Sequence, residues 1–539
     1  MRISGHIIDI ENKRIFKGEI EVAHGMIRCI TEKTEVDDQY LLPGFIDAHV
    51  HIESAMLVPS EFARMAVVHG TVATVSDPHE IGNVLGVEGV HYMIDNGKKV
   101  PFKFYFGAPS CVPATSFETA GAEIDADAVE QLLQKEEVRY LAEMMNWPGV
   151  LNNDPLVMAK IALARKYDKV VDGHAPGLKG EDAQRYIRAG MSTDHECFTE
   201  EEARGKLNYG MKVLIREGSA AKNFEALIDL LQEYPDSIMF CSDDKHPDSL
   251  EEGHINLLVK RALAKGIDLF NVLKAACINP IDHYGLKVGR LREGDFADFI
   301  VVNNPADFEV KQTYINGELV AEKGKTKIPS VHNEIINHFA ANFINAEDLA
   351  VKLKGNRLRV IEALDGQLIT HELFFEPKCE GDYAVADTGR DLLKMAVINR
   401  YAQALPSVAF IKNFRLQRGA IASSVGHDSH NILAVGVDDE SIARAVNLII
   451  KEKGGISAVD GLEEAIIPLP VAGIMSAVDG YEIARQYKAL DAMAKRMGST
   501  LGSPYMTLSF MGLLVIPNLK LSDKGLFDGN RFEFADVFC

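Results

Sequence analysis

One short stretch constrains this chain more than any other: a largely apolar run, residues 42–48, that ends in His49-Val50-His51. Alternate side chains of a β-strand point to the same side, so the imidazoles of His49 and His51 would lie together. Two imidazoles at the end of a buried strand can bind a divalent transition metal, or they can serve only as hydrogen-bonding residues. The other strand ends decide between these two interpretations.

Strand-like and helical segments alternate from about residue 42 to residue 284. After the strand that ends at His51, apolar runs predict seven more strands: Val72–Ser76, Phe102–Gly107, Val138–Met144, Val170–Gly173, Met191–Asp194, Lys212–Ile215 and Ile238–Cys241. Apolar residues at helical spacing, such as Phe62, Met65 and Ala66, lie between them. Eight strand–helix units over roughly 240 residues match a (β/α)8 barrel, an α/β fold. A doubly wound open sheet is the alternative, disfavoured because no Gly-rich phosphate loop follows an early strand.

The segments on either side of the barrel predict two further domains. Residues 1–41 and 285–328 hold short strands, with an Asn316-Gly317 hairpin signal, and together would form a small flanking β-sandwich domain. Residues 42–284 would form the barrel and residues 329–539 a C-terminal α+β domain. In this last domain helices are expected at Asp391–Tyr401, Asp439–Lys453 and Gly480–Met497, and strands at Arg357–Leu364, Gln367–Phe375, Val408–Asn413 and Asn431–Val437.

Polar residues gather at the predicted carboxyl ends of the barrel strands, where the sites of such barrels lie. Besides His49 and His51, these ends supply His79, Glu80, Glu143, His174, His195, Glu196, Arg216, Glu217, Ser219 and Asp243. Glu143 lies within an apolar strand, where an unpaired carboxylate is costly, so it needs a cation, a proton or a salt bridge. Four histidines and two carboxylates converging at one end of a barrel predict a metal centre.

Two ions fit this set better than one, because a single open catalytic site usually keeps three protein ligands and a water. We assign His49, His51 and Asp243 to the more buried ion, His174 and His195 to the other, and Glu143 to a bridging position. Ions roughly 3.5–4 Å apart lower the pKa of a shared water, on which Asp243 would act as general base. Asp244 is adjacent, but on a strand only one of the two can face the barrel axis.

These residues resemble the amidohydrolase superfamily of metal-dependent hydrolases and, within it, the bacterial and archaeal adenine deaminases. The resemblance covers essentially the whole chain and is densest at residues 43–54, 76–84, 172–178, 193–196, 216–223 and 241–247. It implies hydrolysis of adenine to hypoxanthine and ammonia by a metal-bridged hydroxide, in purine salvage or catabolism. It also implies two divalent ions, manganese or iron, with zinc as an alternative.

Each expected site residue has a role under this resemblance. Asp243, Glu143 and Glu196 would be catalytic, and substrate contacts would come from His79, Glu80, Arg216, Glu217 and Ser219. The purine ring must take up a proton, for which Glu196, Glu217 and Glu80 are candidates that the sequence does not rank. For each of these contacts the alternative is a supporting role that orients a ligand imidazole.

Three other functions compete with this one. Ring-opening amidohydrolases that act on cyclic amides typically bridge their metals with a carboxylated lysine, but residues 138–145 contain no lysine. A non-catalytic metal-binding protein on a barrel is disfavoured by the intact ligand set. The zinc nucleobase deaminases are excluded, because they need P-C-x-x-C, which this chain lacks.

Composition limits the partners. A formal charge of −21 argues against a nucleic-acid or anionic-membrane partner, since both need a basic surface. Seven dispersed cysteines and an N-terminus without an apolar signal core fit a reduced, cytoplasmic protein. We expect a small-molecule substrate and a homo-oligomer, with a dimer as the simplest case.

One polar cluster of the C-terminal region, Gly426-His427-Asp428-Ser429-His430-Asn431, stands apart from the barrel in sequence. It could close over the barrel mouth or bind a further metal. A hydrogen-bonded turn between strands is the alternative.

Overall fold

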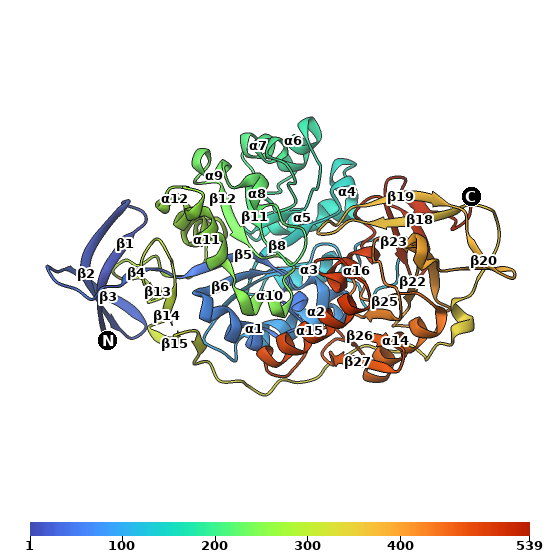
Figure 1. Cartoon of the computed structure of the whole chain (residues 1–539). Coiled ribbons are helices and arrows are strands. Elements are labelled where there is room, and N and C mark those ends of the chain that lie inside the picture. Colours follow the sequence, from blue (N-terminus) through green and yellow to red (C-terminus); the bar gives the residue numbers. More distant parts are fainter.

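The computed structural model describes residues 1–539, and a parallel β-barrel lies at its centre (Figure 1). Its eight strands are β5 (Phe45–Val50), β6 (Thr71–Ser76), β7 (Lys103–Ala108), β8 (Val138–Met144), β9 (Val170–Gly173), β10 (Thr193–Asp194), β11 (Lys212–Arg216) and β12 (Ile238–Cys241). All neighbours pair in parallel, in one arc from β5 to β9 and another from β10 to β12. Bridges between Val171 and Met191 and between Val50 and Asp243 join the arcs into a ring. The predicted (β/α)8 barrel is confirmed.

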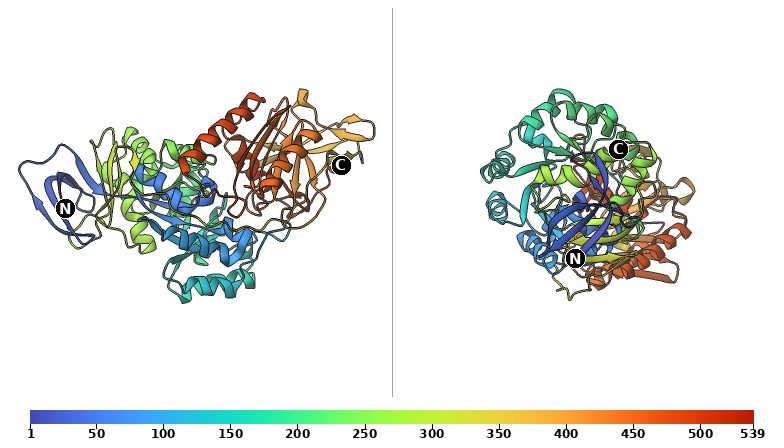
Figure 2. Two further views of the ribbon diagram at one scale, coloured as in Figure 1. Left: turned by 90° about the horizontal axis from the view of Figure 1, so that it is seen from below. Right: turned by 90° about the vertical axis from the view of Figure 1, so that its left-hand side faces the viewer.

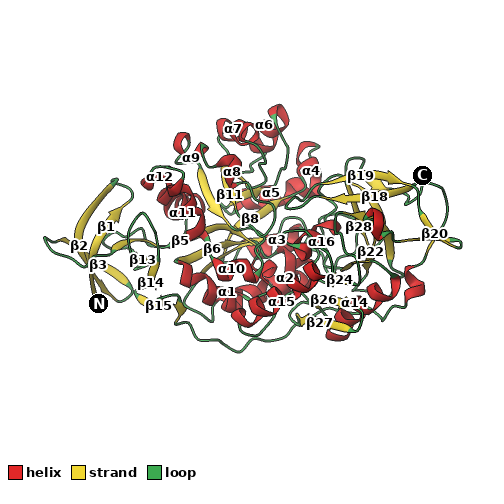
Figure 3. Ribbon diagram, viewed as in Figure 1, coloured by secondary structure: helices red, strands yellow, loops and turns green.

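Helices cover the outside of the barrel strands (Figure 3). The longer ones are α1 (Pro59–Ala66), α2 (His79–Gly97), α3 (Ala126–Leu133), α5 (Pro155–Lys166), α6 (Gly180–Arg188), α7 (Glu200–Asn208) and α11 (Ile255–Ala264). Helix α5 illustrates their local origin: the Asp154 side chain accepts hydrogen bonds from the backbone N–H groups of Leu156 and Val157, and Pro155 fills the first helical position. No helix of the structure combines the length and the apolar character that crossing a bilayer would require.

The two chain segments that flank the barrel form one sheet at its N-terminal side. The strand order is β16-β15-β14-β13-β4-β1-β2-β3. The strands are β1 (Arg2–Asp9), β2 (Arg14–Ala23), β3 (Met26–Glu32), β4 (Tyr40–Pro43), β13 (Phe299–Val302), β14 (Val310–Ile315), β15 (Glu318–Glu322) and β16 (Lys325–Thr326). Antiparallel pairing of β4 with β13 joins the two segments, and Asn316 and Gly317, both at positive φ, make the predicted hairpin turn.

The C-terminal region is built on a second eight-stranded sheet, of order β19-β18-β23-β22-β25-β24-β26-β27. Its strands are β18 (Leu358–Ala363), β19 (Thr370–Phe375), β22 (Leu393–Ile398), β23 (Ser407–Lys412), β24 (Ala420–Ser423), β25 (Ile432–Gly436), β26 (Gly455–Asp460) and β27 (Glu463–Pro468). The expected helices at residues 439–453 and 480–497 are present as α14 (Asp439–Glu452) and α15 (Gly480–Arg496).

The helix expected at Asp391–Tyr401 is wrong, because this segment forms the interior strand β22. All six of its residues are buried, with Met395 and Val397 in the main core and Ala396 and Ile398 against α14. A strand covered on both faces has apolar residues at successive positions, as Met395–Ile398 do, and periodicity cannot distinguish such a run from a buried helix.

The C-terminal region packs on the barrel at the opposite end from the flanking sheet (Figure 2). One continuous hydrophobic core contains side chains of both, from Ile46 of β5 to Leu433 of β25. Polar contacts add to this packing: Tyr487 of α15 lies 2.6 Å from Nδ1 of His246, and Arg64 of α1 lies 2.7 Å from Asp479. Residues more than 200 positions apart are therefore held together where the C-terminal region meets the barrel.

Candidate metal centre

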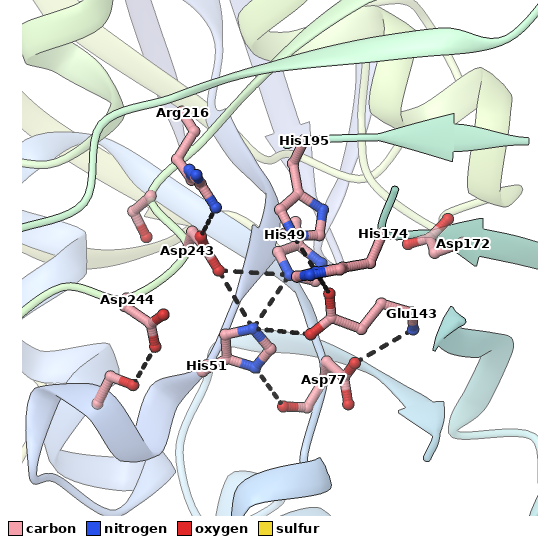
Figure 4. A network of polar contacts seen from close by, with 12 residues as sticks. His49, His51, Asp77, Glu143, Asp172, His174, His195, Arg216, Asp243 and Asp244 are labelled. Carbon is pink, nitrogen blue, oxygen red and sulfur yellow. Dashed lines mark hydrogen bonds and ion pairs between the residues drawn. The ribbon is translucent and has the colours of Figure 1, made fainter. Parts of the chain in front are cut away.

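The six side chains predicted as metal ligands converge at the carboxyl ends of five barrel strands (Figure 4). They are His49, His51, Glu143, His174, His195 and Asp243, and none is more than 5% exposed. The Nε2 atoms of His49 and His51 lie 3.2 Å apart, and Nε2 of His51 lies 3.1 Å from Oδ1 of Asp243. The same Asp243 oxygen lies 3.5 Å from Nε2 of His49. Three donor atoms therefore face one small space.

Glu143 connects this group to the second pair of histidines. Its Oε1 lies 3.3 Å from Nε2 of His51, and its Oε2 lies 2.7 Å from Nδ1 of His174 and 3.2 Å from Nε2 of His195. Burial opposes a charge on Glu143, but the surrounding histidines, His174 foremost, lower its pKa well below the usual range. Each oxygen thus faces a different part of the cluster, as a bridging ligand requires.

The chemistry of this donor set fits divalent cations. Nδ1 of His51 lies 3.2 Å from the backbone carbonyl of Asp77, to which it can donate, leaving Nε2 free for a ligand bond. Nδ1 of His49 and Nε2 of His174 are buried without a hydrogen-bond partner in the chain. Nitrogen and carboxylate donors packed this closely repel one another unless a proton or a cation lies between them.

The backbone orients the adjacent residues Asp243 and Asp244 differently. Asp243 is hydrogen-bonded to β5 through both backbone groups: its N–H donates to His49 O (3.0 Å), and its carbonyl accepts from His51 N (3.3 Å). Its side chain consequently faces the two histidines. The Asp244 carboxylate accepts a hydrogen bond from Ser54 Oγ at 2.5 Å instead.

A buried guanidinium lies behind the metal centre. Arg216 donates to Asp243 Oδ2 at 2.6 Å and forms a two-pronged ion pair with Glu196. Burial opposes the charge of Asp243, but Arg216 and the nearby histidines lower its pKa well below the usual range. Arg216, predicted as a substrate contact, is therefore bonded to two carboxylates of the chain and is not among the residues that line the cavity.

The remaining predicted contacts divide into two groups. His79 and Glu80, at the start of α2, line the cavity above the ligands, with His79 Nδ1 3.5 Å from Glu143. Glu217 and Ser219 are not among the residues that line it. Glu217 pairs with Arg261 at 2.7 Å, and Ser219 Oγ accepts from the backbone N–H of His246 at 2.9 Å.

The C-terminal region completes the cavity over the metal ligands. It contributes Leu368, His427, Asp428, Phe510 and Leu513. The cluster at residues 426–431 thus closes over the barrel mouth, one of the roles weighed from the sequence. The three apolar residues gave no signal in the sequence, because an isolated Leu or Phe is far more often a core residue.

Asp77 was not assigned a supporting role from the sequence. Its carboxylate accepts hydrogen bonds from the backbone N–H groups of His79 (3.0 Å) and Glu143 (3.3 Å).

Comparison with known proteins agrees with this architecture. Residues 40–320 match the model of the amidohydrolase family, and residues 367–533 match the adenine deaminase C-terminal domain. The chain is 56% identical over 539 residues to an adenine deaminase of Salinibacter ruber, covering 99% of this chain and 98% of that one. It is 53% identical to an adenine deaminase of Methanosarcina mazei and 48% to one of Borreliella burgdorferi, with 99% of each chain covered. The chain is a metal-dependent hydrolase that belongs to the adenine deaminase family of amidohydrolases.

Proposed function

We propose that this chain hydrolyses adenine to hypoxanthine and ammonia. The metal centre would hold two divalent ions, manganese or iron, through the six residues assigned from the sequence. The observation that carries the proposal is the position of Glu143, whose two oxygens face two separate groups of histidines. A side chain that already supplies two oxygens from β8 needs no carboxylated lysine.

When bound, such ions would lower the pKa of a water held between them and polarise the carbon under attack. Asp243 is placed to take the proton from that water, because its Oδ1 faces His49 and His51 while Arg216 holds its Oδ2. The same carboxyl then returns the proton to the amine as the carbon–nitrogen bond breaks, so that ammonia leaves neutral. Arg216 keeps Asp243 ionised and oriented before each turnover.

Of the three candidates for the ring proton, Glu80 is the one that lines the cavity without being held by Arg216. Burial opposes its charge, but His427 and His430 are paired with it and lower its pKa well below the usual range, so a proton would reach the purine ring from these imidazoles through Glu80. Glu196 is held by both terminal nitrogens of Arg216, and Glu217 is paired with Arg261 outside the cavity. Glu80 lines the cavity, and its Oε1 lies 3.5 Å from Nε2 of His79. His79 in turn lies beside Glu143, so Glu80 and the metal ligands form one continuous polar wall.

The alternatives are another amidohydrolase reaction on a cyclic amide and the deamination of a different aminopurine. We would load metal-depleted protein with Mn²⁺ or Fe²⁺ and measure ammonia release from adenine and other aminopurines, and ring opening of cyclic amides. Adenine is expected to be the fastest substrate. The proposal fails if a cyclic amide is opened faster, or if adenine releases no ammonia while two ions are bound.

A further inference from the structure

We propose that Asp428, supplied by the C-terminal region, recognises the imidazole-side N–H of a purine and thereby selects a free base over a purine substituted at N9. This inference rests on the proposed function, because it names how the same cavity orients its substrate. It gives the C-terminal region a role in substrate binding.

The Asp428 carboxylate lines the cavity and has one oxygen without a hydrogen-bond donor. The residue is 3% exposed, and its Oδ2 is buried without a hydrogen-bond donor from the chain. The nearest cationic partner of Oδ1 is Nε2 of His79, at 3.7 Å, which is too long for a hydrogen bond. A buried carboxylate oxygen without a donor is costly, so this one is suited to a donor that arrives with a ligand.

The loop that carries Asp428 is held in place on both sides. Within it, the backbone N–H of Gly426 donates to Nδ1 of His430 at 3.2 Å. From outside, Tyr401 donates to the carbonyl of Ser429 at 2.6 Å, and Asn431 donates to the carbonyl of Thr119 at 2.9 Å. The carboxylate is therefore pre-positioned, which lowers the entropic cost of binding to it.

Apolar and aromatic side chains accompany Asp428 in the lining of the cavity. Apolar side chains line it at Met145, Leu368, Phe510 and Leu513. The His427 ring stacks on Phe510, with ring centres 5.0 Å apart and planes inclined by 23°. Because Nδ1 of His427 bonds to Glu80, the loop also orients the residue proposed to protonate the ring.

The donor that Asp428 can accept follows from the chemistry of adenine. Adenine has two kinds of hydrogen-bond donor, the exocyclic amine and one N–H of its five-membered ring. The amine must lie at the metal ligands, because it leaves from the carbon under attack. Only the ring N–H remains for an acceptor on the C-terminal side, and a substituent at N9 removes that donor.

The test compares adenine with 9-methyladenine on metal-loaded full-length enzyme. In the wild type we expect kcat/KM for adenine to exceed that for 9-methyladenine by about 10³-fold or more, since a site built to bond a donor rejects a ligand without it. Asp428→Ala should lower kcat/KM for adenine by about 10²-fold, mainly through KM, while 9-methyladenine changes by less than about threefold. Asp428→Asn, which keeps an acceptor oxygen, should lie in between.

The matched control is Glu118→Gln, which alters a buried carboxyl near the same loop that does not line the cavity. It should leave the ratio between the two substrates unchanged. The inference is overturned if Asp428→Ala lowers both substrates by the same factor, if it changes neither, or if it releases a bound ion. A wild type that deaminates no adenine would instead overturn the proposed function.

Discussion

The two walls of the cavity are built on different principles. The barrel wall is a dense cluster of imidazoles and carboxylates, in which Glu143 lies close to His51, His174 and His195. The C-terminal wall is mostly apolar and carries one carboxylate, Asp428, with an unused oxygen. The first arrangement suits cation binding and proton transfer, and the second suits recognition of a flat ligand. Changes on the barrel wall should therefore alter metal content and kcat, whereas changes on the C-terminal wall should alter KM and selectivity.

The largest effect is expected from Glu143→Gln. An amide cannot supply two anionic oxygens, so the variant should lose bound metal and at least about 10³-fold in kcat. Metal analysis by mass spectrometry, alongside ammonia release, measures both quantities. A variant that kept two ions and full turnover would contradict the role of Glu143 as the bridging ligand.

A comparison of Asp243→Asn with Asp244→Asn tests whether the general base is correctly assigned. Asp243→Asn should reduce kcat by about 10³-fold, because the amide cannot accept the proton of the attacking water. Asp244→Asn should cost less than about tenfold, since that carboxylate accepts from Ser54 and makes no hydrogen bond to His49 or His51. Equal losses in the two variants would contradict the assignment.

Glu80→Gln lies where the two walls meet, and its effect should be intermediate. Because an amide cannot pass a proton from the paired histidines to the ring, the variant should lose about 10²-fold in kcat while both ions stay bound. The pH profile of kcat should lose one of its ionisations. An unchanged profile would assign the ring proton to another group.

The smallest expected effect concerns stability. Burial, and then the charge of Asp428, raise the pKa of Glu118 to about 8. The unfolded chain releases this proton near pH 4.3, so the folded state binds the extra proton between about pH 4.3 and 8 and loses stability as pH rises through that window. Relative to Glu118→Gln, the wild type should lose on the order of 3 kcal/mol between pH 5 and 8. Thermal unfolding of both proteins at several pH values measures this, and a constant difference would refute it.

The sequence by itself predicted the barrel and the cluster of histidines and carboxylates at the carboxyl ends of its strands. Side chains alternate along a strand, so His49 and His51 were expected on one face. An isolated carboxylate in an apolar strand is costly, so Glu143 was expected to bind a cation or another charged group. Both signals are local, because each depends only on strand geometry and on the energetics of burial. The apolar segment 393–398 had no such signal, and whether it became a helix or a strand depended on neighbours far away in the chain.

Only the tertiary structure decided which residues complete the cavity. Glu217 and Ser219 follow a barrel strand as closely as His174 does, yet their side chains bond to Arg261 and to the backbone of His246. Asp428 and Phe510 come from the other end of the chain; Asp428 belongs to a polar cluster for which the sequence left several roles open, and Phe510 has no distinguishing pattern of its own. They reach the barrel mouth because one continuous hydrophobic core fixes the C-terminal region there, and packing of that kind depends on the whole chain at once.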